Sequence, residues 1–71
     1  MKHTFDAGEM GCGSLIFKLR VRFLEMEPGD QLEIIAHSVG AREDLPAWCR
    51  MTGHTLISAE HPVYVIQKKL D

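Results

Sequence analysis

The chain has 71 residues, and its eight Lys and Arg against ten Asp and Glu give a formal net charge of −2. This length predicts a single domain over residues 1–71, and 45% hydrophobic with 25% charged residues excludes a disordered chain. The negative charge argues against direct nucleic-acid binding, which needs a positive field. No apolar run is long enough to cross a membrane, and residues 1–6 lack the apolar core of a signal peptide. We therefore expect a cytoplasmic monomer.

The first half of the chain predicts a strand and then a helix. Residues 3–7 form a short candidate strand. Residues 14–27 fit both templates, because residues 17–23 alternate as in a strand while apolar residues also recur at helical spacing. Their length favours a helix. The buried face of this helix would carry Leu15, Ile16, Leu19, Phe23 and Met26. A second apolar stripe would stay partly exposed, and it comprises Phe17, Val21 and Leu24.

The next segments predict a second strand and a second helix. Residues 31–37 alternate as in a strand. Residues 44–52 form a candidate helix with Asp44 as its N-cap. Pro46 would then lie in the first turn, where its missing N–H is harmless, and Gly53 would terminate the helix.

The last segments complete an α+β pattern. Residues 54–61 and 63–69 predict two strands joined by a tight turn at His61-Pro62. The order β-α-β-α-β-β implies a two-layer sandwich, in which two helices cover one face of a four-stranded mixed sheet.

Cys12 is the residue most suited to chemistry. It follows the first predicted strand and precedes the first helix, where backbone N–H groups carry partial positive charge and stabilise a thiolate. Gly11 and Gly13 beside it leave room for a partner's thiol, and Ser14 offers an oxygen to cap the helix. The alternative reading is that Cys12 is a small residue that fills a turn.

Other chemically active residue types show no site-like spacing. Cys49 lies inside the second predicted helix beside Trp48, which favours packing in the core. The four histidines, expected mostly at the surface or at strand ends, show no paired spacing, so a metal site with the cysteines has little support. No phosphate-binding loop and no catalytic triad can be proposed from the sequence.

Several segments together resemble the TusA/SirA-like family of sulfur-carrier proteins. In the first half these are Phe5-Asp6, Gly11-Cys12, Leu19-Arg20, Pro28-Gly29-Asp30 and Leu32-Glu33-Ile34. The second half is closer still, through the residues Asp44-Leu45-Pro46-Ala47-Trp48-Cys49-Arg50, Thr52-Gly53-His54 and Tyr64-Val65-Ile66-Gln67-Lys68-Lys69. The resemblance covers residues 5–69.

This resemblance implies the same two-layer fold and a sulfurtransferase activity that needs no cofactor and no metal. Cys12 matches the family cysteine that accepts sulfane sulfur as a persulfide and passes it on, in tRNA thiolation or other sulfur metabolism. The implied partners are a sulfur donor, such as a cysteine desulfurase or a rhodanese-like protein, and an acceptor protein. Arg20 matches a basic position that faces the donor in some members. We expect the partner to dock on Phe17, Lys18, Arg20 and Val21.

The sequence departs from the family at the motif around the cysteine. The family pattern is Cys-Pro-x-Pro, whereas this chain has Cys12-Gly13-Ser14-Leu15, with neither proline. Proline at the first helical position is preorganised for a helix, and glycine gives a looser start. A second hypothesis therefore stays open, in which the chain is a non-catalytic interaction or regulatory module that retains the fold.

Overall fold

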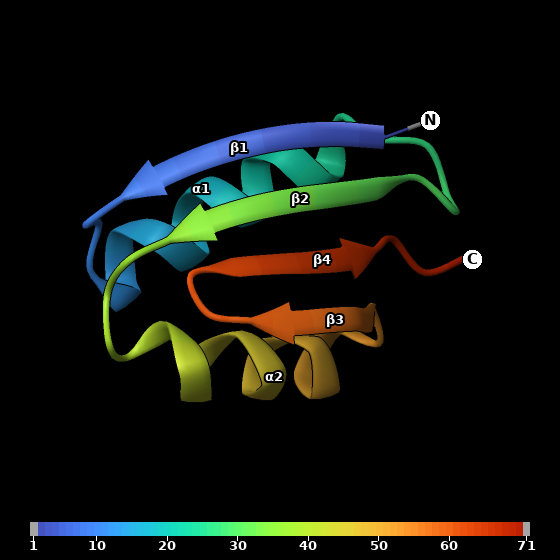
Figure 1. The fold of residues 1–71 in the computed structure, drawn as a ribbon. Helices are drawn as coiled ribbons and strands as arrows, with labels where there is room; N and C mark the ends of the chain where they lie inside the picture. The colour runs from blue at the N-terminus through green and yellow to red at the C-terminus, as the bar shows by residue number, and fades with distance from the viewer. Residues whose placement is uncertain (1, 71) are drawn as a thin grey trace.

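The computed structural model describes residues 2–70, and the side chains of Lys2 and Cys12 lie outside the described part. The chain forms six elements, which are β1 (Lys2–Gly8), α1 (Cys12–Leu24), β2 (Gln31–Ala36), α2 (Ala41–Thr52), β3 (Thr55–Glu60) and β4 (Val63–Gln67). This order confirms the predicted β-α-β-α-β-β arrangement (Figure 1).

The four strands form one mixed sheet in the order β1-β2-β4-β3. β1 is parallel to β2, whereas β4 is antiparallel to both β2 and β3. Along β2 and β4, buried residues alternate with partly exposed ones, because successive side chains of a strand point to opposite faces. Both helices pack on the same side of the sheet (Figure 1), so the fold has one layer of helices and one layer of strands.

The hydrophobic core lies between the helices and the sheet. Leu15, Leu19 and Phe23 of α1 are buried, as the i, i+4 spacing of the predicted apolar face requires. Trp48 of α2 is 6% exposed, and its ring meets the Phe23 ring edge-on with centroids 5.1 Å apart. Aromatic pairs in this arrangement add about 0.5–1.5 kcal/mol beyond the burial of their area. This pair joins the two helices.

The first helix begins and ends earlier than the predicted residues 14–27. Gly11 has an extended backbone and serves as the N-cap, so Cys12 is the first helical residue. At the other end the chain leaves the helix through short i→i−3 bonds, such as Met26 N to Phe23 O at 3.2 Å. Met26 is therefore buried, as predicted, without being helical.

The prediction that the second helix begins at Asp44 is wrong. The helix begins at Ala41, with Gly40 as its N-cap, and Asp44 donates its N–H to the Gly40 carbonyl at 2.9 Å. Pro46 is therefore the sixth helical residue and lies outside the first turn. Its missing N–H leaves the Arg42 carbonyl without an i+4 donor, and because Arg42 is exposed, water can supply one.

The C-terminal half otherwise follows the sequence pattern. Gly53 terminates α2 as predicted, with a left-handed φ of 88° that favours glycine. β3 and β4 form the predicted hairpin around His61-Pro62.

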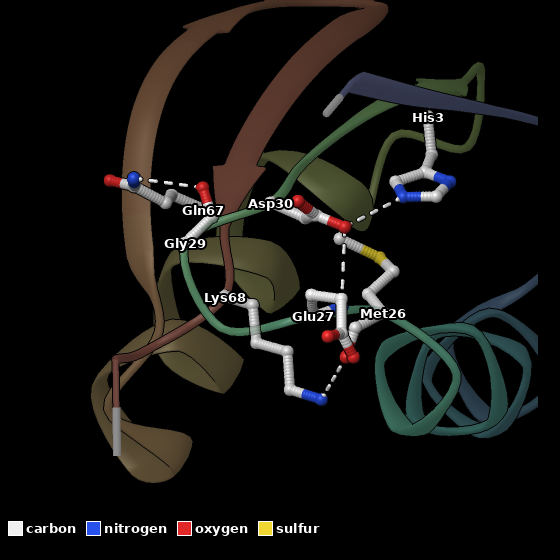
Figure 2. A network of polar contacts seen from close by, with 7 residues as sticks. All are labelled: His3, Met26, Glu27, Gly29, Asp30, Gln67 and Lys68. Carbon is white, nitrogen blue, oxygen red and sulfur yellow. Dashed lines mark hydrogen bonds and ion pairs between the residues drawn. The ribbon is translucent and has the colours of Figure 1, made fainter.

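A polar network fixes the end of the sheet where β1 and β2 begin (Figure 2). The buried Asp30 carboxylate lies 3.0 Å from His3 Nε2 and accepts the Glu27 N–H at 3.2 Å. Gly29 N–H donates to the Lys68 carbonyl, and Lys68 N–H donates to the Asp30 carbonyl. These bonds connect β1, the turn after α1 and the chain after β4. The opposite end of the sheet leads into both helices.

Candidate functional site

The backbone at the start of α1 provides the electrostatic setting for Cys12. Helical hydrogen bonding begins with Leu15 N–H, which donates to the Gly11 carbonyl at 2.8 Å. The N–H groups of Cys12, Gly13 and Ser14 precede that bond, so they have no partner within the helix and carry partial positive charge. A sulfur anion on the first residue of the helix is stabilised by this arrangement.

The described residues on either side of Cys12 leave the space around them open to solvent. A Cβ built on Gly11 or Gly13 would meet no heavy atom within 4 Å. Ser14 is exposed and occupies the third helical position, so the N-cap is Gly11 rather than a serine hydroxyl. The first turn of α1 holds no acidic residue that would disfavour a thiolate. The side chain of Cys12 itself lies outside the described residues.

Three loops meet at this end of the sheet. His37 N–H donates to the Gly8 carbonyl and Ala36 N–H donates to the Pro62 carbonyl, both at 2.8 Å. These bonds hold three connections together at one end of the sheet: the chain between β1 and α1, the chain between β2 and α2, and the turn between β3 and β4 (Figure 1). A partner that reaches Cys12 therefore approaches the end of the sheet where these three connections meet.

The same end of the sheet contains a hollow that the sequence did not predict. It has a volume of about 440 Å³ and is lined by Arg42, Ala59, Glu60, His61 and Tyr64. His61 Nδ1 and the Tyr64 hydroxyl are hydrogen-bonded there. Burial raises the pKa of Tyr64, and the positive charge of Arg42 partly opposes this shift. The lining residues lie far apart in the sequence, and no motif signals that they meet.

Cys49 is packed in the core, as predicted. The residue is 5% exposed and lies at the start of the last turn of α2. Burial disfavours the thiolate and raises its pKa to about 11, an effect that the nearby Arg50 charge opposes only in part. Cys49 is therefore a poor nucleophile near neutral pH.

The residues expected to dock a partner lie on the surface of α1. Phe17 is 61% exposed and Val21 41%, and the predicted stripe continues to the exposed Leu24. Lys18 and Arg20 are exposed beside this stripe. The second apolar stripe therefore remains uncovered, as its helical spacing predicted.

Arg22 lies on the same helix but already has partners in the fold. Its guanidinium donates to the Thr4 carbonyl at 3.3 Å and lies over the Phe5 ring, 5.2 Å from the centroid. Lys18 and Arg20 are therefore the more accessible charges of α1.

Besides His61, two more of the four histidines have partners in the fold. His54 lies against Phe23 and Trp48, with ring centroids 4.6 and 5.2 Å apart, and its Nδ1 accepts the Lys69 N–H. His3 belongs to the Asp30 network. Among residues 2–70, leaving aside the side chains of Lys2 and Cys12, no three His, Cys, Asp or Glu gather as metal ligands. No described helix is long and apolar enough to cross a bilayer.

A four-stranded mixed sheet, two helices on one face and a cysteine that opens the first helix define a small thiol-bearing α+β domain. Residues 3–68 match the family model described as Sulfurtransferase TusA. The chain belongs to this family, and the resemblance noted in its sequence is confirmed.

The related proteins carry consistent names. Over 70 residues the chain is 30% identical to the sulfur carrier protein TusA of Pseudomonas paraeruginosa, a match that covers 93% of this chain and 89% of the relative. It is 36% identical over 56 residues to a protein of Neisseria meningitidis serogroup A named as a sulfur carrier, covering 79% and 76% of the two chains. YrkF of Bacillus subtilis, also named as a sulfur carrier, is 37% identical over 62 residues, which are 84% of this chain and 34% of YrkF.

Proposed function

We propose that this protein is a sulfur carrier that accepts sulfane sulfur on Cys12 as a persulfide and relays it to a partner protein. The observation that carries the proposal is the position of Cys12 as the first residue of α1. The backbone N–H groups there favour the negative charge of a thiolate and then of a persulfide. Membership of the TusA family and the names of the relatives support the same role.

The proposed transfer balances without a cofactor or an external oxidant. The Cys12 thiolate attacks the outer sulfur of a donor persulfide, so a new S–S bond forms at Cys12 while the donor's S–S bond breaks. The donor leaves as a thiolate. An acceptor thiolate then attacks the outer sulfur on Cys12, and Cys12 leaves as a thiolate in its turn. Sulfur moves as a neutral atom between thiolates of the three proteins.

The proposal requires a donor and an acceptor that reach the start of α1. The exposed Phe17 and Val21, with Lys18 and Arg20 beside them, continue from the start of α1 along its surface. We assign the docking of the donor to this surface. An apolar stripe edged by cations fits a partner whose contact surface is apolar and acidic.

Mass spectrometry of the intact protein tests the role of Cys12. After incubation with a persulfide donor, we expect the wild type to gain the mass of one sulfur atom and to lose it on treatment with a reducing agent. Cys12→Ala should gain nothing. Cys49→Ala is the matched control and should load as the wild type does.

Two outcomes would contradict the proposal. Equal loading of Cys12→Ala and wild type would assign the sulfur to another residue. A wild type that stays unmodified with both protein and small-molecule persulfide donors would favour the non-catalytic interaction module. The absence of both motif prolines beside Cys12 is the observation that keeps this second function open.

A further inference from the structure

The sheet has a second face, which no described element covers. In β2, Leu32, Ile34 and Ala36 point into the core, so Glu33 and Ile35 point to the opposite side. Figure 1 shows both helices on the other side of the sheet. Side chains on this open face lie outside the core, so packing in the core does not determine which residue types occur there.

The strand register arranges the open face in rows across the sheet. One row contains four paired residues, from β1 to β3: Asp6, Ile35, Val63 and Glu60. The next row contains Thr4, Glu33, Val65 and Ser58. The centre of the face is thus an apolar patch of Ile35, Val63 and Val65, with carboxylates around it on three of the four strands.

These carboxylates have no cationic partner among the described residues. Asp6 accepts the Gly8 N–H at 2.9 Å, and no ion pair joins Asp6, Glu33 or Glu60 to any residue of the described part of the chain. The exposed Lys18 and Arg20 lie on α1. Lys2 pairs with Gln31, one row further along the sheet than Thr4 and Glu33, so the two rows described here hold no Lys or Arg. The open face is therefore acidic around an apolar centre.

The spacing of the two rows fits a helix. Neighbouring strands lie about 4.8 Å apart, so Asp6 and Glu60 are separated by roughly 14 Å across the sheet. A helix with its side chains is about 10–12 Å wide. A helix along β2 and β4 would place its apolar stripe on Ile35, Val63 and Val65 and its flanks near Asp6 and Glu60, while Glu33 would lie beside Val65.

We propose that the open face docks an amphipathic helix of a partner protein, with Lys and Arg on both sides of its apolar stripe. Charge complementarity selects this occupant, since cations on the flanks meet Asp6 and Glu60. A second copy of this chain is a poorer fit. Its basic helical side on another copy's sheet would make a head-to-tail contact, which builds a ring or a filament and not a two-fold dimer.

Titration of the ¹⁵N-labelled full chain with synthetic helical peptides tests this surface. The probe is an amphipathic peptide of Leu and Lys, and its control carries Glu in place of Lys. We expect the Lys peptide to shift the amide signals of Glu33, Ile35 and Val65, and the Glu peptide to leave them unchanged. Raising the salt concentration should weaken the binding.

A triple variant, Asp6→Asn with Glu33→Gln and Glu60→Gln, separates charge from shape. The Asp6→Asn substitution retains a side-chain oxygen that can accept the Gly8 N–H. The loss of the ion pairs at Asp6 and Glu60, together with the charge of Glu33, should weaken the binding of the Lys peptide about tenfold. The double variant Lys18→Gln with Arg20→Gln changes only the helical side and should bind as the wild type does.

Several results would overturn this proposal. They are signal shifts confined to α1 and α2, equal binding of both peptides, and unchanged binding by the triple variant. Self-association of the chain alone that the triple variant abolishes would make a second copy the occupant, against the proposal. None of these measurements involves Cys12, so their failure leaves sulfur transfer untouched.

Discussion

The two cysteines lie in the two helices of one layer, and their positions in those helices predict opposite chemistry for them. Cys12 is the first residue of α1, where N–H groups lack helical partners. Cys49 lies near the end of α2, where it is buried and its pKa is raised to about 11. The comparison teaches that the reactivity of a thiol depends on its place in a helix and on its burial.

The largest expected effect is a difference in alkylation rate between the two thiols. At pH 7 a pKa of about 11 leaves roughly one Cys49 in ten thousand as thiolate. An ordinary exposed thiol is a few per cent ionised at that pH. We therefore expect iodoacetamide to modify Cys12 at least about a hundredfold faster than Cys49. Peptide mapping by mass spectrometry measures both rates in one sample, and rates within tenfold of each other would break the comparison.

The next effect concerns stability. Here substitution of Cys49 should have the larger effect, whereas Cys12 has the larger alkylation rate. Cys49→Ala should lower the free energy of unfolding by about 1–2 kcal/mol, because it removes a buried sulfur. Cys49→Ser should cost more, since it buries a hydroxyl. Cys12→Ala, at the end of a helix, should change it by less than about 0.5 kcal/mol. Urea unfolding measures all three, and a larger loss in Cys12→Ala than in Cys49→Ala would show that Cys12 is the core residue.

Sequence patterns predicted the fold better than the ends of its helices. The spacing of apolar residues predicted β2 and β4, whose buried residues alternate, while the length of residues 14–27 decided between helix and strand for α1. The start of α2 was misplaced, since Asp44 is a strong N-cap residue type, whereas Gly40 caps the helix through its carbonyl and gives a weaker signal.

The candidate site also has one part that the local sequence predicts and one part that it does not. A helix start directly after a cysteine can be read locally, so Cys12 was found, and its role stays a prediction. The hollow at Arg42, His61 and Tyr64 depends on contacts between segments that only the folded chain brings together.

A smaller, several-fold effect should follow Gly13→Pro, which restores the first proline of the family motif. Proline disfavours helical backbone in the residue before it, whereas Cys12 is now helical. We expect the helix to start one residue later, with Cys12 as the N-cap, where side chains accept the free N–H groups. A gain of about 0.3–1 kcal/mol for the thiolate would speed alkylation at pH 6 by roughly two- to fivefold.

Two controls accompany this variant. Cys49 should alkylate at an unchanged rate in Gly13→Pro, because α2 is not altered. Gly11→Ala, which places a methyl group in open space at the N-cap, tests whether bulk beside Cys12 matters. Slower alkylation of Cys12 in Gly13→Pro would show that the Gly13 N–H contributes more than the new cap.

The smallest effect is a pH dependence of stability from His54, which lines a shallow hollow with Cys49. Burial lowers the pKa of His54, and the charges of Lys69 and Lys68 lower it further. The unfolded chain therefore takes up a proton first as the pH falls through about 6.5, so the free energy of unfolding should decrease from pH 7.5 to pH 5.5.

Protonation of His54 would also remove the Nδ1 lone pair that accepts the Lys69 N–H. The charged imidazolium in the folded chain is therefore poorly solvated and also lacks this hydrogen bond. His54→Phe retains a ring against Phe23 and Trp48 but cannot titrate. Urea midpoints at the two pH values should differ less in this variant than in the wild type, while His37→Asn, at an exposed position, leaves the wild-type difference in place. An equal difference in His54→Phe and wild type would mean that the packing behind Cys49 does not respond to pH through His54.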